Sequence, residues 1–98
     1  MYFEWDPEKD KINKKIHGIS FSTAKFVFND IERWERYDFS HSKGEDRWQT
    51  IGLVDNVLFV VYTEQGEAIR IISARKADEN ERRVYDGKRN AAGWTKAN

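Results

Sequence analysis

The spacing of hydrophobic positions divides the chain into a helical N-terminal third and a strand-rich remainder. Residues 2–5 alternate between aromatic and acidic side chains, which predicts a short strand. From Ser20, a residue type that caps helices, hydrophobic side chains recur at helical spacing in Phe21, Ala24, Val27, Phe28 and Ile31. This spacing predicts a second, core-forming helix, and it stops near Arg33.

A first helix is expected before it, between two strong boundary signals. Asp6 offers an N-cap oxygen, Pro7 suits the first helical position, and Gly18 supplies the left-handed residue that ends a helix. Apolar residues are sparse in this segment, mainly Ile12 and Ile16, which are four residues apart. We therefore expect a surface helix with one narrow buried stripe and a lysine-rich outer face.

Runs of strand-like composition make up the middle of the chain, after a possible short strand at Trp34 and Tyr37. Three runs cover residues 46–54, 57–64 and 67–74, and the breaks between them are of hairpin size, Asp55-Asn56 and Gln65-Gly66. An antiparallel meander is the natural arrangement, and a last helix is expected from Asp78 to about Tyr85. The predicted fold class is α+β, an antiparallel sheet with two N-terminal helices and one C-terminal helix.

One domain is expected. A chain of 98 residues has room for a single core, and its 39% hydrophobic and 14% aromatic content supports one despite 35% charged residues. The domain is predicted over residues 1–86, and residues 87–98 are expected to form a polar, frayed tail.

Several classes of chemistry find no support in the residues. There is no cysteine, the two histidines are far apart, and no phosphate-binding glycine loop or nucleophile elbow occurs, so no metal site and no cofactor is expected. The N-terminal segment has no apolar run of the kind that signal peptides or membrane spans need. A cytoplasmic protein without membrane contact is expected.

Charge is unevenly distributed along a chain whose formal net charge is zero. Residues 7–17 and 67–89 are locally positive, whereas residues 29–66 carry a net charge of −4. This polarity suits a protein that presents one face to a phosphate chain and another to a protein partner. A solvated surface of mixed charge explains it equally well.

The chemistry that these residues leave open is catalysis by positioned bases and arginines, the type that metal-free ribonucleases use. The candidate catalytic residues for it are His17, Tyr62, Arg70 and Arg75. His17 precedes Gly18 at a helix end, where it either meets substrate or only caps the last carbonyls. Tyr62 is either a proton donor or a base-stacking platform, or is simply packed.

The two arginines are candidates for a bidentate phosphate clamp, against ordinary ion pairing. In a regular strand Arg70, Ile72 and Ala74 share one face while Ile69, Ile71 and Ser73 share the other. Arg70 and Arg75 would then point to opposite faces, so a joint role requires the strand to bend or end near Ala74. Five further basic residues are candidate RNA contacts: Lys14, Lys15, Lys76, Arg82 and Arg83. Surface pairing with Asp78 and Glu79 is the simpler explanation for the last two.

An ordered set of short strings along residues 3–85 resembles the BrnT toxin family. The N-terminal strings are Phe3-Glu4-Trp5-Asp6, Asn13, His17-Gly18-Ile19-Ser20-Phe21, Ala24 and Val27-Phe28-Asn29-Asp30. The later strings are His41-Ser42, Glu45-Asp46-Arg47-Trp48, Ile51-Gly52, Val61-Tyr62-Thr63-Glu64, Ile69-Arg70-Ile71-Ile72-Ser73-Ala74-Arg75-Lys76-Ala77, Glu81-Arg82-Arg83 and Tyr85. The Ile-Arg-Ile-Ile-Ser-Ala-Arg string is the most distinctive.

The resemblance implies a fold like that of the RelE ribonucleases and an endoribonuclease activity that arrests translation and growth. It also implies neutralisation by a BrnA-type antitoxin in a 2:2 heterotetramer, which reaches DNA only through the antitoxin and represses its own operon. One position departs from the family pattern: a lysine often precedes the His-Gly pair, where this chain has Ile16. If that lysine binds RNA in the family, then in this chain either Lys14 or Lys15 takes its role or the contact is absent.

Two other functions remain open on the sequence. The first is a catalytically inactive module that only binds the antitoxin within a repressor complex, which the departure at Ile16 favours. The second is an RNA-binding domain without cleavage, which the zero net charge disfavours because its affinity would rest on phosphate neutralisation.

Overall fold

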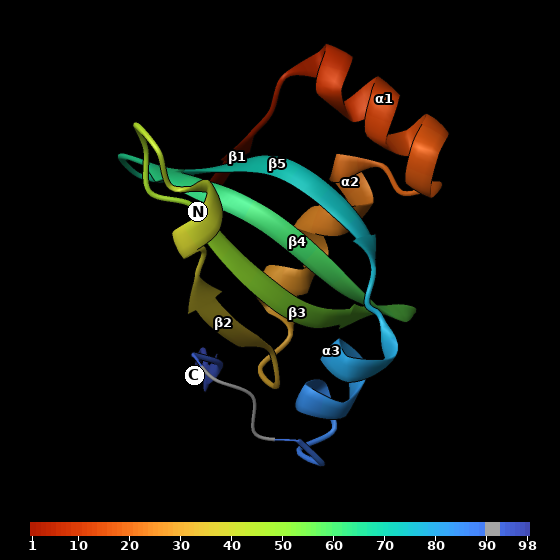
Figure 1. The fold of residues 1–98 in the computed structure, drawn as a ribbon. Helices are drawn as coiled ribbons and strands as arrows, with labels where there is room; N and C mark the ends of the chain where they lie inside the picture. Colours follow the sequence, from red (N-terminus) through yellow and green to blue (C-terminus); the bar gives the residue numbers. More distant parts are fainter. Residues whose placement is uncertain (90–92) are drawn as a thin grey trace.

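A computed structural model describes residues 1–89 and 93–98 of the chain. Its strands form one sheet with the order β1-β5-β4-β3-β2-β6. They are β1 (Tyr2–Glu4), β2 (Trp34–Tyr37), β3 (Trp48–Val54), β4 (Asn56–Gln65), β5 (Ala68–Lys76) and β6 (Thr95–Lys96). The α-helices are α1 (Pro7–His17), α2 (Phe21–Ala24) and α3 (Glu79–Tyr85), and the 3₁₀ turns are η1 (Lys25–Asn29) and η2 (Phe39–His41). Figure 1 shows the sheet passing in front of α2.

The predicted α+β class is confirmed, and β4 pairs antiparallel with both β3 and β5. The sheet as a whole is mixed, because β1 pairs with β5 in parallel. A sheet that is antiparallel throughout was therefore wrong. The chain leaves β1 through α1 and α2, and it reaches the far side of the sheet before the meander begins, so β1 is left at the opposite edge.

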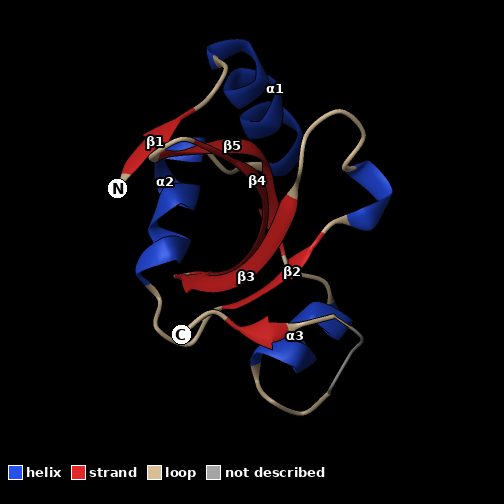
Figure 2. Cartoon of the chain, turned by 90° about the vertical axis from the view of Figure 1, so that its left-hand side faces the viewer, coloured by secondary structure: helices blue, strands red, loops and turns tan. Residues whose placement is uncertain are grey.

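The two faces of the curved sheet carry separate cores. Figure 2 shows the sheet curving around α2 and the turn that follows it, while α3 lies outside the curve. The inner core consists of Ile19, Phe21, Ala24, Val27, Leu58, Val60, Ile71 and Ala74. The outer core, beneath α3, consists of Ile51, Phe59, Ala77, Val84 and Trp94. Each strand residue therefore belongs to an inner or an outer face, and cross-strand partners share one.

The first helix begins and ends where its boundary signals predicted. Asp6 accepts a hydrogen bond from the Glu8 amide at 2.9 Å, and Gly18 ends the helix with a positive φ of 73°. The expected buried stripe is wrong, because Ile12 is 55% exposed and Ile16 is 67% exposed.

Asn13 faces the sheet in place of that apolar stripe, and its residue exposure is 6%. Its side-chain amide donates to the carbonyls of Ile19 and Ala74 at 2.9 and 2.8 Å, and it accepts from the Ala74 amide at 3.1 Å. Pairing with β1 covers β5 only up to Arg70, so the backbone groups of Ala74 need other partners. The Asn13 side chain supplies these hydrogen-bond partners. The helix α1 therefore contacts the sheet through a side-chain amide and not through apolar residues.

The second helix is shorter than its sequence pattern predicted. Ser20 caps it through the Thr23 amide at 3.2 Å, but the α-helix ends at Ala24 and continues as 3₁₀ turns. A side-chain carbon at Gly52 would lie 3.0 Å from the Val27 Cβ, so this segment approaches β3 at backbone distance. Ile31 lies beyond the turn and is 75% exposed, outside the expected apolar face.

A β-bulge in β5 changes which side chains share a face. Tyr62 on β4 pairs with Ile71, and Val61 pairs with Ser73, so Ile72 is an extra residue without a partner. The regular alternation expected along residues 69–75 is therefore wrong after Ile71.

The consequence of the bulge appears in the two arginines on the strand. Ile71 and Ala74 both lie in the inner core. Arg70 pairs across the sheet with Thr63, and Arg75 pairs with Phe59, so both arginines belong to the outer face. Without the bulge, the side chains of Arg70 and Arg75 would lie on opposite faces of the sheet. The bulge places both on the same face, which a joint role in binding one phosphate requires.

The C-terminal segment differs from the frayed tail expected over residues 87–98, of which residues 90–92 lie outside the described part. Trp94 is 6% exposed and meets Phe59 edge-on at a ring distance of 6.4 Å. The strand β6 pairs with β2. Residues 93–98 thus extend the sheet and close the outer core, because Trp94 supplies apolar surface that a polar tail would lack. Within the described residues, no helix is both long and apolar enough to cross a bilayer.

Candidate active site

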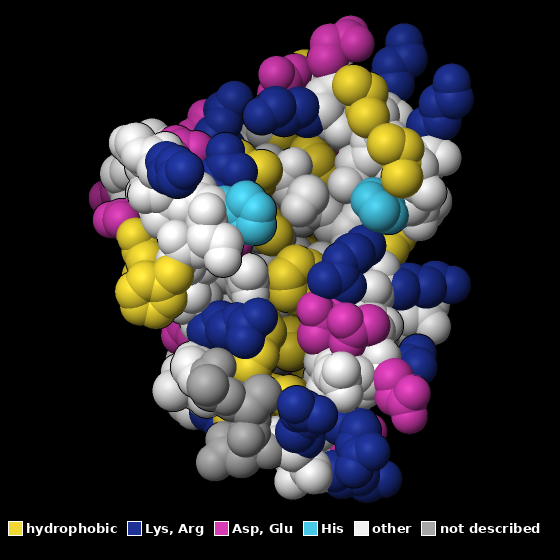
Figure 3. Space-filling view, viewed as in Figure 1, with side chains coloured by type: hydrophobic (Ala, Val, Ile, Leu, Met, Phe, Trp, Pro, Cys, Tyr) yellow, Lys and Arg dark blue, Asp and Glu magenta, His cyan; other side chains and the backbone are white. Residues whose placement is uncertain are grey.

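The outer face of the sheet carries a hollow of about 370 Å³ where strands β2 to β5 meet α3. We call it the outer hollow. It is lined by Arg36, Asp38, His41, Arg47, Gln49, Phe59, Val61, Ile72, Ser73, Arg75 and Glu81. Figure 3 shows hydrophobic side chains in a hollowed band on this face, with basic side chains and both histidines around it. The lining combines three arginines and a histidine with two carboxylates.

A carboxylate and an imidazole form the chemical centre of the hollow. Asp38 ends β2 and caps η2 by accepting from the His41 amide at 3.2 Å. The His41 Nδ1 lies 3.1 Å from the Asp38 Oδ1, and because a carboxylate only accepts, this pair assigns the proton to Nδ1. The His41 side chain is 67% exposed and that of Asp38 only 4%. The His41 ring is therefore open to solvent while a buried acid holds it through Nδ1, which leaves Nε2 as its second polar atom.

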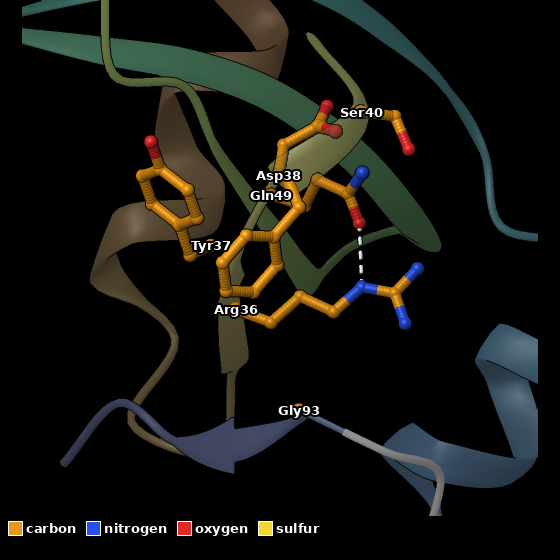
Figure 4. Close-up of a pocket in the computed structure, with 7 residues that line it drawn as sticks. Arg36, Tyr37, Asp38, Ser40, Gln49 and Gly93 are labelled. Atoms are coloured by element: carbon orange, nitrogen blue, oxygen red, sulfur yellow. Dashed lines mark hydrogen bonds between the residues drawn. The ribbon is translucent and has the colours of Figure 1, made fainter. Parts of the chain in front are cut away.

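Polar side chains connect the dyad to a second side of the hollow. The Gln49 amide lines the hollow beside Asp38 and lowers the pKa of that carboxyl group, and Arg36 Nε donates to Gln49 Oε1 at 2.7 Å. Figure 4 shows Gln49 lying between the two charged side chains. The Arg36 guanidinium also lies 4.4 Å from the centre of the Trp94 ring. One line of neighbouring polar side chains thus runs along the wall of the hollow, and we call it the fixed row: His41, Asp38, Gln49 and Arg36.

Asp38 stays ionised over a wide pH range. Burial opposes its charged form, but favourable interactions with Gln49 and His41 outweigh burial and hold its pKa below the usual value. An ionised Asp38 can then stabilise the imidazolium that forms when His41 takes a proton.

Replacing Asp38 by asparagine is expected to weaken the fold in a pH-dependent way. The pKa of Asp38 is lower in the folded chain than the unfolded value of about 3.9, so its charge stabilises the fold above that pH. This contribution is lost as pH falls through the folded pKa. Urea unfolding should therefore show a deficit of about 1–3 kcal/mol for Asp38→Asn at pH about 7 that shrinks below pH about 4. A deficit that is the same at both pH values would contradict the assignment.

Arg75 enters the hollow with its charge already paired. Its Nη1 and Nη2 donate to the two carboxylate oxygens of Glu81 at 2.8 and 2.9 Å, and its guanidinium lies 4.1 Å from the Phe59 ring centre. The hydrogen bonds that Arg75 donates to Glu81 outweigh burial and raise the pKa of Arg75. Glu81 also accepts from the Asp78 amide at the start of α3. The pair therefore fixes α3 against β5 and fixes the direction of the guanidinium.

Arg47 is the least satisfied cation of the hollow. Its buried Nε finds no hydrogen-bond acceptor among the described residues, although the Glu45 Oε1 lies within ion-pair distance at 3.5 Å. Three guanidiniums against the carboxylates of Asp38 and Glu81 give the lining a net charge of +1 before His41 is counted. An anionic ligand such as a phosphate would complete this arrangement.

The structure separates the four residues that the sequence suggested for catalysis. Arg75 lines the outer hollow. Arg70 lies on the same face but pairs with Glu4 at 3.5 Å and is not among the lining residues. His17 is exposed at the end of α1.

Tyr62 lies on the inner face, at 3% exposure, and donates to Glu35 at 3.3 Å. Burial raises the pKa of its hydroxyl. It therefore faces away from the outer hollow.

The five expected RNA contacts fall into two groups on the surface. Lys14 and Lys76 line a separate hollow of about 360 Å³ beside Asp55, and Lys15 is exposed nearby on α1. Arg82 and Arg83 are exposed on α3.

Sequence reasoning missed four residues of the hollow: Arg36, Asp38, His41 and Arg47. His41 and Arg47 were part of the strings that resemble the BrnT family, but no chemical role was drawn from them. The spacing of Asp38 and His41, three residues apart, was a local signal for a capped turn that holds an imidazole.

Comparison with known proteins identifies a family that the chain matches. The model of the family described as "Ribonuclease toxin, BrnT, of type II toxin-antitoxin system" matches residues 5–81. That range contains every residue that lines the outer hollow. A comparison with curated proteins gave no significant match. The match covers most of the chain, and we conclude that the protein belongs to the BrnT family of ribonuclease toxins of type II toxin–antitoxin systems.

Proposed function

We propose that this protein is an endoribonuclease that cleaves RNA in the outer hollow, with His41 as the catalytic base. The observation that carries the proposal is the contact of 3.1 Å between His41 and the buried Asp38, in a hollow that also holds three arginines. A base whose ring is held by a buried acid, beside cations that can take a phosphate, is what cleavage through the 2′-hydroxyl requires.

The reaction follows from these positions. His41 Nε2 takes the proton of the 2′-hydroxyl, and the 2′ oxygen attacks the adjacent phosphorus while the bond from phosphorus to the 5′ oxygen breaks. The products are a 2′,3′-cyclic phosphate and a 5′-hydroxyl. The leaving 5′ oxygen takes a proton from solvent, to which the imidazolium later returns the one it removed. Arg36, Arg47 and Arg75 stabilise the charge on the phosphorane.

We further propose that cleavage needs no metal ion. The guanidiniums supply the positive charge that a cation would otherwise provide at the phosphate, and His41 supplies the base. Among the described residues, no three or more histidine, cysteine, aspartate or glutamate side chains are grouped so that they could hold a metal ion. Cleavage that persists in the presence of a chelator tests this part of the proposal.

The family is one of type II systems, so an antitoxin is the expected partner. We propose that it is of the BrnA type, that the pair forms a 2:2 heterotetramer on DNA through the antitoxin, and that the free toxin arrests translation and growth in the cytoplasm. A RelE-like fold is part of the same proposal. Lys14, Lys15, Lys76, Arg82 and Arg83 would then extend the RNA contact beyond the outer hollow, with His17 and Arg70 at its margin.

A catalytically inactive antitoxin-binding module is the alternative. It is favoured by α1, whose Ile12 and Ile16 are more than half exposed and offer apolar surface to a protein. This alternative predicts harmless expression with antitoxin binding retained.

A matched pair of arginine variants tests the nuclease proposal. Arg75→Lys keeps the charge in the outer hollow but loses the bidentate geometry, whereas Arg70→Lys makes the same change outside it. We expect Arg75→Lys to lower RNA cleavage about 10- to 100-fold, and Arg70→Lys to stay within about twofold of the unchanged protein. Purified proteins would be assayed for 2′,3′-cyclic ends in chelator, and urea midpoints would establish that both variants fold.

Growth after induction completes the test. Arrest with new 5′ ends in cellular RNA supports the nuclease. Folded, soluble protein that neither arrests growth nor yields new ends would overturn it and favour the antitoxin-binding module. Equal losses in the two arginine variants would place the phosphate outside the outer hollow.

A further inference from the structure

A second hollow adjoins the outer one on the side of β2. It has a volume of about 370 Å³ and is lined by Arg36, Tyr37, Asp38, Phe39, Ser40, Gln49 and Gly93. We call it the side hollow. Arg36, Asp38 and Gln49 line both hollows, so the two share a wall that is the fixed row next to His41. Figure 4 shows the side hollow, with Arg36 and Gln49 on one side and Tyr37 on the other.

Phe39 is the unusual residue of this hollow, because an aromatic side chain stands 87% exposed on a short 3₁₀ turn. Its ring lies 4.8 Å from the Tyr37 ring, and the two ring planes meet at 75°. Tyr37 in turn packs on Trp48 at 5.3 Å and donates to Asp46 at 2.7 Å. Phe39 thus has a fixed aromatic neighbour but leaves most of its surface exposed, which does nothing for the core.

The polar groups around the ring suit a flat, polar-edged ligand. Ser40 is exposed next to Phe39, and the Gln49 amide and Arg36 guanidinium lie on the shared wall. A nucleobase has an apolar face that stacks on an aromatic ring and a polar edge that such groups can meet. The volume is adequate for one base, and the hollow is open to solvent on the side of Phe39.

We propose that the side hollow binds a nucleobase of single-stranded RNA, stacked on Phe39, beside the phosphate that is cleaved in the outer hollow. The inference rests on the proposed ribonuclease function. Arg36 lies on the wall between the two hollows and is placed to contact the phosphate that joins the stacked nucleotide to the next one. The substrate must be single-stranded there, because a base inside a helix has no free face for Phe39.

The shared row gives this subsite a role in positioning. The base rests against Gln49 and Arg36, and Gln49 lines the same wall as the Asp38 that holds His41. Stacking therefore sets the position of the RNA backbone relative to His41 Nε2. Base preference at the cleaved position would arise from the edge contacts in the side hollow.

The test compares Phe39→Ala with Phe39→Trp and with Phe26→Ala. Phe26 is a half-exposed phenylalanine on η1, which lies on the inner side of the sheet, and it serves as the control for losing an exposed ring. We expect Phe39→Ala to raise the KM for a short single-stranded RNA about 10- to 100-fold, with a smaller change in kcat. Phe39→Trp keeps an aromatic ring, so its KM should stay close to that of the unchanged protein. Phe26→Ala should also leave the KM unchanged.

Binding without cleavage separates this inference from the nuclease proposal. A 2′-O-methyl oligoribonucleotide cannot be cleaved, and its affinity can be measured by fluorescence anisotropy with and without an abasic site at each position. One abasic position should weaken binding to the unchanged protein about 10- to 100-fold but have little further effect on Phe39→Ala. This result supports the subsite even if the protein cleaves no RNA.

Two results would overturn the subsite. One is cleavage and oligonucleotide binding by Phe39→Ala equal to those of the unchanged protein. The other is a loss of antitoxin binding in Phe39→Ala with RNA binding intact, which would assign the exposed ring to a protein contact.

Discussion

Replacing His41 by alanine is expected to lower RNA cleavage by about 10²- to 10⁴-fold, the range found for general acid–base residues. The imidazole is the group that takes the 2′-hydroxyl proton, and no other described histidine lines the outer hollow. The side chain is 67% exposed, so its removal should leave the fold stable. The measurement is the single-turnover cleavage rate of a short RNA in chelator, beside the urea midpoint of the variant.

The matched control is His17→Ala, because the chain's other histidine is also exposed and lies on α1. We expect its cleavage rate to stay within about threefold of the unchanged protein, because His17 does not line the outer hollow. Asp38→Asn should lie between the two, since it leaves His41 present but loosely held. A large loss in His17→Ala with none in His41→Ala would move the catalytic base to the end of α1.

Replacing Asn13 by alanine is expected to destabilise the fold by about 3 kcal/mol or more. Its side chain makes three hydrogen bonds to backbone groups of Ile19 and Ala74 at a position only 6% exposed. Each buried group left without a partner costs about 1–3 kcal/mol. At about 4–8 °C per kcal/mol for a chain of this size, the midpoint should fall by roughly 12 °C or more.

The neighbouring substitution Lys14→Ala provides the control for Asn13. Lys14 is exposed on the same helix, so its loss should change the unfolding free energy by less than about 0.5 kcal/mol. Both variants can be followed by circular dichroism during thermal and urea unfolding. A midpoint of Asn13→Ala within a few degrees of the unchanged protein, about 3 °C or less, would mean that α1 is held by other contacts.

Local signals in the sequence determined much of the fold. The ends of α1 followed from Asp6, Pro7 and Gly18, because capping depends only on residues next to one another along the chain. The meander followed from strand-like runs separated by two short breaks, since hairpin pairing is set by turn length. The resemblance to the BrnT family was likewise confirmed by the family match, because it depends on the order of residues alone.

Features that depend on distant contacts were decided only in the tertiary structure. The helix α1 faces the sheet with the Asn13 side-chain amide and not with an apolar stripe. The reason lies sixty-one residues away in the chain, at Ala74, whose backbone amide and carbonyl bond Asn13 because no strand pairs with them. The bulge at Ile72 brings Arg70 and Arg75 to one face, and a single unpaired residue leaves no signature in the hydrophobic pattern.

The candidate active site is also a feature that only the tertiary structure decided. His41 and Asp38 are close in sequence, but the pair alone does not make a site that could bind a phosphate. The other polar groups of the hollow come from three different strands: Arg36, Gln49 and Arg75. Hydrophobic spacing and boundary residues therefore determined the class of fold, and the resemblance of ordered residue strings indicated the family. Pairing between strands determined which side chains meet, because contacts across a sheet are set by register and not by sequence distance.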